Sequence, residues 1–183
     1  MKKQHYRLKK YIEKDTKEEN LLKIEAIANI SQKNIKLNFQ IIGNIEAYFI
    51  HSKLENEEKI ERKNELWKST CFELFIANEQ SEEYYEINIS PFRQWNIYHF
   101  DGYKKGMKEF KKVSEPIIQM TKENYNYKLS FEIEFNQKIF NNEGLSFNLA
   151  TIILDKNNLR HFYTMYPRKT ADFHNRMSWK TKN

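Results

Sequence analysis

The sequence predicts an all-β fold, a sandwich or barrel with few or no long helices. Short segments in which apolar and polar residues alternate recur along the chain, separated by turn residues, as is typical of sandwiches and barrels. No long segment carries apolar residues at the spacing of a helix face. The 183 residues contain no Pro/Gly/Ser-rich linker, so residues 1–183 are predicted to form one domain.

In the first third of the chain, alternation is clearest in residues 22–28 and 35–41, which predicts two strands joined by a turn at 31–34. Asn, Ser and Gly, which favour turns, punctuate this region. The other elements expected there are an edge strand within residues 2–15, a charged turn at 16–20, a turn at Gly43 and Asn44, a fourth strand at 45–51, and a charged loop or short helix at 54–64 that leads to Trp67.

Residues 70–77 and 84–90 form the clearest predicted hairpin, with a polar loop between them. A register shift of one residue would exchange the buried and exposed faces of a strand, so the apolar pattern fixes the pairing. The register that keeps apolar residues together gives the cross-strand pairs Phe72–Ile89, Leu74–Ile87, Ile76–Tyr85, Glu73–Asn88 and Phe75–Glu86. One face of this hairpin is therefore core, and the other carries two carboxylates, an amide and an aromatic ring.

Pro91 cannot donate to a strand ladder and ends the hairpin, after which a third strand is expected at 95–100. Either face of that strand could be core, so either Tyr98 or His99 stands beside Glu86. The later elements expected are a short helical or irregular piece at 108–115, a strand that begins at Pro116, strands at 127–135, 145–154 and 159–166, and turns at 136–144 and 155–158.

Several of these segments resemble the bacterial DOMON-like proteins related to type 9 carbohydrate-binding modules. The matching features are Trp67, Thr70, Glu73 and Phe75, then YYEINISP, Trp95, Tyr98, Phe100, DGYKKGM, and finally Pro167, Lys169, Asp172, Phe173 and His174. The resemblance extends over nearly the whole chain, and its specific motifs occupy about a third of it. It implies a two-sheet antiparallel β-sandwich, of jelly-roll or immunoglobulin-like type, with a face suited to sugars.

Composition excludes several classes of function. The formal net charge is +6 and the pI is about 9.1, but acidic residues are interleaved with basic ones, as in LENEEKIERKNE. Nucleic-acid recognition, which relies on clustered Arg and Lys, is therefore not expected. Neither a membrane segment nor a signal peptide is expected, which predicts a cytoplasmic protein, and the lone Cys71 excludes an internal disulfide. Composition does not indicate the oligomeric state.

The two carboxylates of the central hairpin, Glu73 and Glu86, are the main candidates for chemistry. They could act as acid and base in a glycosidase, accept hydrogen bonds from sugar hydroxyls, or hold a hard cation such as Ca²⁺. They could also simply pair with Lys, Arg or Asn across the sheet. Haem is not expected, because His161 and Met165 share one face of one strand and cannot approach iron from opposite sides. No cofactor is therefore predicted.

Aromatic residues and one polar loop are the other candidates for a ligand-binding site. Trp67, Trp95, Trp179 and Tyr98 could stack on sugars, although core or rim positions are expected for Trp67 and Trp95, and Trp179 is expected to be exposed. The polar loop at 167–177 could cap a pocket over the carboxylates or be a solvated tail.

We therefore predict a non-catalytic binding module with a polar concave face for a small carbohydrate-like or other polar ligand. Two alternatives stay open, a glycoside-processing enzyme that uses paired carboxylates with auxiliary His174, and a protein-interaction sandwich without a small ligand. The predicted ligand-binding residues are Glu73, Glu86, Asn88, Arg93, Trp95, Tyr98, Asp172 and His174.

Overall fold

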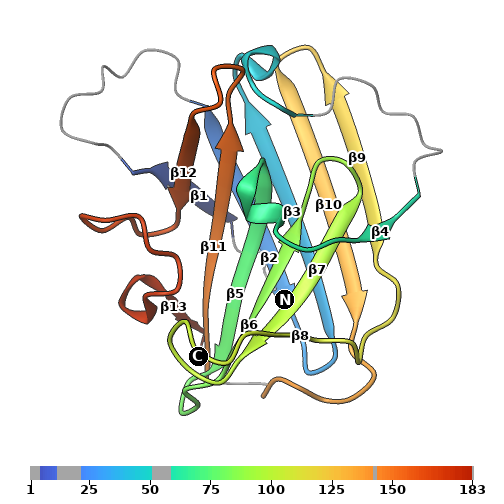
Figure 1. The fold of residues 1–183 in the computed structure, drawn as a ribbon, viewed down its shortest axis with the longest axis vertical. Coiled ribbons are helices and arrows are strands. Elements are labelled where there is room, and N and C mark those ends of the chain that lie inside the picture. The colour runs from blue at the N-terminus through green and yellow to red at the C-terminus, as the bar shows by residue number, and fades with distance from the viewer. Residues whose placement is uncertain (1–4, 12–21, 51–58, 142–143, 183) are drawn as a thin grey trace.

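The computed structural model describes residues 5–11, 22–50, 59–141 and 144–182. These residues form strands and three short 3-10 turns (Figure 1), which confirms the all-β prediction. No described helix has the length and apolar character needed to cross a membrane. The elements are β1 (His5–Lys10), β2 (Lys23–Ile30), β3 (Asn34–Ile42), η1 (Ile45–Ala47), β4 (Glu61–Arg62), η2 (Leu66–Lys68), β5 (Cys71–Asn78), β6 (Tyr84–Ile89), β7 (Gln94–Phe100), β8 (Lys108–Glu109), β9 (Ile117–Glu123), β10 (Asn126–Glu134), β11 (Leu145–Leu154), β12 (Arg160–Thr164), η3 (Arg176–Ser178) and β13 (Lys180–Lys182).

The strands form one continuous, curled sheet in the order β4-β7-β6-β5-β11-β12-β1-β2-β3-β10-β9, with β8 and β13 attached at its sides. We call β1, β2, β3, β10 and β9 the β3 arm, and β12, β11, β5, β6, β7 and β4 the β5 arm. Strand β1 joins the two, because its first residues pair with β2 and its last two with β12. Among the described strands, only β4 and β7 pair in parallel. The finer prediction of two separate antiparallel sheets is therefore not confirmed.

The hydrophobic core lies between the two arms. Phe39 of β3 packs against Phe72 of β5, with ring centroids 5.1 Å apart, and Phe72 stacks on Tyr127 of β10 at 6.1 Å. Leu74, on the same face of β5 as Phe72, is fully buried. Burial of a side chain of this size contributes about 2 to 3 kcal/mol, so the apolar faces of the alternating strands hold the arms together.

The register predicted for the central hairpin is confirmed at all five pairs. Its neighbour β7 resolves the face that the sequence left open. Trp95 and Ile97 point into the core, opposite Ile89 and Ile87, while Tyr98 stands beside Glu86 on the outer face. The outer face of the β5 arm thus collects the polar residues of three adjacent strands.

Four predicted elements differ from the structure. The strand expected at 45–51 is instead the turn η1, because Ile45 and Ile50 are both buried and a strand would point residues five apart to opposite faces. Strand β1 is no edge strand, since it has neighbours on both sides. Residues 108–115 contain the short strand β8, and 59–64 contain β4. The turn at 16–20 and residues 54–58 lie outside the described residues.

Candidate functional site

The C-terminal segment, residues 171–179, lies against the outer face of the β5 arm (Figure 1). Phe173 and Trp179 pack against Phe75, with ring centroids 6.1 and 6.2 Å away. The indole Nε1 of Trp179 donates to the carbonyl of Phe173 at 2.8 Å, which ties the segment to itself. Trp179 is only 8% exposed, so the prediction of an exposed Trp179 is wrong, because its ring helps to seat this segment on the sheet.

A cavity of about 360 Å³ remains between the sheet and the segment. Its volume lies in the range of small-molecule sites. Its polar lining consists of Glu73, Glu86, Lys104, Arg160, Asp172 and His174, and its apolar lining of Trp67, Phe75, Phe100, Met107, Ile152, Phe162, Ala171 and Phe173.

Glu73 lies in the wall of this cavity and is only 2% exposed. Its Oε1 has no hydrogen-bond partner among the described residues. Burial raises the pKa of this carboxyl well above its ordinary value, and the nearby charge of Glu86 raises it further. Only a hydrogen bond with Cys71 acts in the opposite sense, so the net shift of the pKa favours the protonated form of Glu73.

Glu86 is diagonal to Glu73 across the β5–β6 pair and is 4% exposed. Its Oε1 accepts a hydrogen bond of 2.7 Å from the amide of Asn88. Burial raises the pKa of Glu86 to about 7, and the Asn88 hydrogen bond moderates the rise. Burial thus favours the protonated form at both carboxyls, and a protonated carboxyl can both donate and accept hydrogen bonds.

His174 approaches the pair from the C-terminal segment. Its Nδ1 lies 2.7 Å from the hydroxyl of Tyr84, and its Nε2 lies 3.9 Å from Oε2 of Glu86. The Tyr84 hydroxyl also accepts from the backbone N–H of Lys104 at 3.2 Å. The imidazole thus lies between Tyr84 and Glu86, with one ring nitrogen facing each of them. Burial, with a smaller effect of Lys104, lowers the pKa of His174 to about 4 and keeps the ring neutral.

Asp172 connects the C-terminal segment to the loop after β7 at the edge of the cavity. It pairs with Lys104 at 3.0 Å and accepts a hydrogen bond from Tyr103, both in the loop that follows β7. Although burial raises the pKa of Asp172, these two donors lower it by more, so the net shift is downward. The C-terminal segment and the loop after β7 are thus held together at one side of the cavity.

The structure brings together half of the predicted site residues. Glu73, Glu86, Asp172 and His174 line the cavity. Asn88 and Tyr98 lie on the same face beneath it, where Asn88 supports Glu86 and Tyr98 packs edge-on against Trp67 at 5.5 Å.

Two predicted site residues lie elsewhere. Trp95 points into the core, with the Arg62 guanidinium 4.1 Å from its ring centroid. Arg93 occupies the turn before β7, at a positive φ of 58°. Its side chain is therefore not placed at the cavity, because the turn lies at the end of the hairpin rather than on its outer face.

Sequence reasoning missed Lys104, Arg160 and most of the aromatic wall. Lys104 belongs to the DGYKKGM segment, whose match to the resembled family was the one available signal. Among the described residues, no group of three or more His, Cys, Asp or Glu side chains is placed to hold a metal ion.

Two solved structures with a similar fold are described as carbohydrate-binding. A candidate carbohydrate-binding protein from Bacteroides uniformis superposes with a TM-score of 0.67 at 14% identity, over 97% of this chain and 84% of that chain. A family 9 carbohydrate-binding module from Caldicellulosiruptor kristjanssonii, solved in complex with glucose, gives a TM-score of 0.51 at 10% identity, over 91% and 77%. At these identities the likeness is one of fold. Neither a protein-family model nor a curated protein matches the sequence.

Proposed function

We propose that this protein binds a small neutral carbohydrate in the cavity above Glu73 and Glu86. The observation that carries this proposal is Oε1 of Glu73, which is buried in the cavity wall without a partner among the described residues. An unsatisfied buried polar atom costs about 1 to 3 kcal/mol, and such atoms in a native protein call for an explanation. A ligand hydroxyl that donates to Oε1 would remove this cost.

The rest of the cavity suits the same class of ligand. A protonated carboxyl offers a donor and an acceptor side by side, which matches neighbouring hydroxyls better than it matches a cation. Phe75, Phe100 and Trp67 supply apolar surface for the C–H face of a sugar ring. The glucose complex of the family 9 module shows that this fold can serve such a ligand in another protein.

We propose further that the module binds its ligand without hydrolysing it. Hydrogen-bonding groups and apolar walls are all that binding needs, and the cavity supplies both. The raised pKa values of Glu73 and Glu86 do not decide between binding and hydrolysis, because a glycosidase also keeps one carboxyl of a pair protonated. The choice is therefore tested with aryl glycosides.

The test uses Glu73→Leu, which keeps most of the side-chain volume and removes the polar atoms. We expect calorimetric titration with glucose, galactose, mannose and xylose to find a ligand for the wild type, and binding to the variant to be about 100-fold weaker or lost. The same variant should unfold at a higher temperature than the wild type, because the buried orphan oxygen is gone.

Thr151→Val is the matched control. Its hydroxyl is also buried without a partner among the described residues, but it lies on the core face of β11. It should stabilise the protein in the same sense and leave sugar binding unchanged. The proposal fails if no monosaccharide binds, or if Glu73→Leu binds as tightly as the wild type. Release of nitrophenol from aryl glycosides would show that the site is catalytic.

A further inference from the structure

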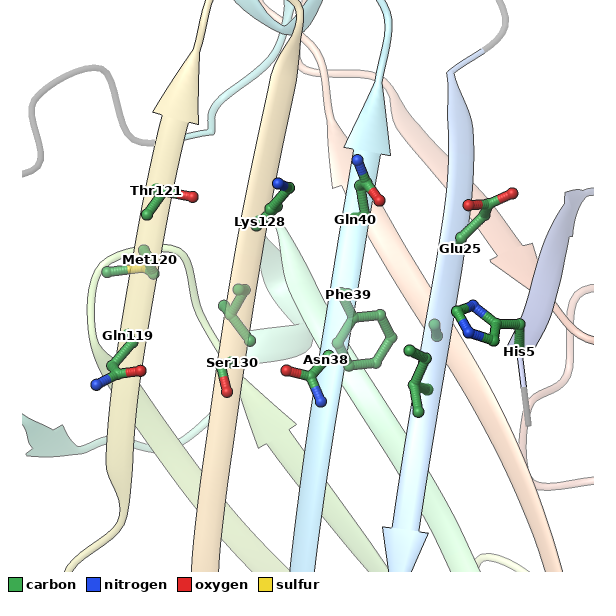
Figure 2. A pocket seen from close by; sticks show the side chains of 13 residues that line it. His5, Glu25, Asn38, Phe39, Gln40, Gln119, Met120, Thr121, Lys128 and Ser130 are labelled. Carbon is green, nitrogen blue, oxygen red and sulfur yellow. The ribbon is translucent and has the colours of Figure 1, made fainter. Parts of the chain in front are cut away.

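The outer face of the β3 arm carries a second cavity, of about 300 Å³ (Figure 2). Two rows of side chains cross it at right angles to the strands. Asn38, Ser130 and Gln119 are register neighbours on β3, β10 and β9, and Gln40, Lys128 and Thr121 form the next row. Adjacent strands are about 4.8 Å apart and alternate residues about 7 Å apart, so the rows form a regular grid of polar groups. The Ser130 side chain is the shortest of these six side chains and lies in the middle of its row, so the surface is hollow there.

Gln40 donates to Oδ1 of Asn126 at 2.9 Å, but most of these polar groups have no partner in the described part of the chain. The side chains of Asn38, Ser130, Gln119 and Thr121 make no hydrogen bond to another described residue. The next row on the same face does have internal partners, because Lys36 and Glu132 form an ion pair at 3.0 Å. The free groups are therefore confined to the hollow and bounded by a satisfied ion pair.

The chemistry of the hollow selects the ligand. Each carboxamide offers two donors and an acceptor, and each hydroxyl offers both roles, so the set matches a chain of hydroxyls. The hollow has no cluster of cations that would select an anion, because Lys128 stands at one side and Glu25, which pairs with Lys23 at 2.8 Å, at the other. A peptide strand cannot add between β3 and β10, because their backbones are paired on both sides. The free edge of β9 lies at the border of the groove.

We infer that this groove is a second binding site, which takes an uncharged oligosaccharide lying across β3, β10 and β9. The site is on the other arm of the sheet from the Glu73 cavity and does not depend on it. A cavity in one arm and a groove on the other would let one domain hold a sugar and a chain at the same time.

The test is a titration of ¹⁵N-labelled protein with cellohexaose, xylohexaose, mannohexaose and maltohexaose, followed by amide chemical shifts. We expect at least one hexasaccharide to shift the amides of β3, β10 and β9 around the groove. Asn38→Ala/Gln119→Ala should weaken that binding about tenfold, the effect of one or two neutral hydrogen bonds. The single variant Gln119→Ala, at an exposed position, repeats the test if the double variant does not fold. Lys36→Ala, on the same face but outside the groove, is the control and should bind as the wild type does.

The outcomes separate the two sites. Shifts confined to the lining of the Glu73 cavity would overturn the groove and leave the first proposal intact. No shift with any hexasaccharide, or a double variant that binds as the wild type does, would also overturn it. Binding that weakens steeply between 50 and 500 mM NaCl would refute the assignment to an uncharged ligand, because neutral hydrogen bonds are not screened by salt.

Discussion

Replacing Glu86 by glutamine tests the electrostatics of the cavity through stability. In the folded protein the pKa of Glu86 rises from its ordinary 4.5 to about 7, so the folded state holds this proton more tightly than the unfolded chain. The stabilising contribution is full below pH 4.5 and is lost as the pH rises through 7. The difference between the two values corresponds to about 3 kcal/mol above pH 7.

The introduced glutamine does not titrate, and its side-chain oxygen can still accept the hydrogen bond from Asn88. We therefore expect Glu86→Gln to be about 3 kcal/mol more stable than the wild type at pH 8, and about equal to it at pH 4.5. Urea unfolding at several pH values between 4 and 8.5 measures this difference. His174, whose pKa is lowered to about 4, acts in the opposite sense, but it is present in both proteins and cancels.

Glu132→Gln is the control of opposite sign. Glu132 is exposed, and its hydrogen bond from Lys36 lowers its pKa, so its removal should slightly destabilise the protein at pH 8. A Glu86→Gln protein that is less stable than the wild type at pH 8 would refute the reasoning. So would a stability difference that does not change with pH, since that would mean that Glu86 has no raised pKa.

Three further substitutions test other contacts. Tyr84→Phe should cost about 1 to 3 kcal/mol by urea unfolding, because the backbone N–H of Lys104 and Nδ1 of His174 lose their shared partner; an unchanged stability would exclude that bridge. Arg62→Lys should lower the free energy of unfolding by about 1 kcal/mol. An ammonium cannot stack on Trp95 and also reach both the side-chain oxygen of Asn96 and the Phe110 carbonyl. Its control, Arg160→Lys at an exposed position, should change the stability little. Trp179→Phe should lower the free energy of unfolding by about 1 to 3 kcal/mol, because the hydrogen bond to the Phe173 carbonyl is lost. It should also speed tryptic cleavage at Arg176. Cleavage at the wild-type rate would contradict the proposal that Trp179 holds the C-terminal segment on the sheet.

The sequence predicts the centre of the fold better than its periphery. Strands β5 and β6 each have one strictly apolar face, so the register that buries both faces is unique and places Glu73 and Glu86 on the opposite side. In β7 both faces are apolar enough to be core, and alternation alone could not choose between Trp95 and Tyr98. The choice is made by the neighbouring strand, which presents Ile87 and Ile89 to Ile97 and Trp95.

The cavity itself could not be predicted, because its roof comes from a part of the chain without periodicity. Residues 171–179 fold back through single contacts, such as those of Phe173 and Trp179, rather than through a repeating pattern. Sequence spacing also does not show whether a carboxyl has a cation close to it. The absence of a cation beside Glu73 among the described residues becomes visible only once β5, β6 and the C-terminal segment are assembled.

The position of β1 has a consequence for how the protein is made. Lys9 pairs with Thr164, so the seam between the arms joins a strand that leaves the ribosome early to one that leaves it late. Until β12 emerges, β1 and β2 form the end of an open sheet whose outer edge can accept a strand from another nascent chain. The β2–β3 and β9–β10 hairpins can form locally during synthesis, but β3 pairs with β10 only after residues 126–134 have emerged. Closure of the sheet must wait for nearly the whole chain. Slow translation of the last part of the mRNA would lengthen the time before β12 emerges. The risk of misassembly should rise with the local concentration of incomplete chains.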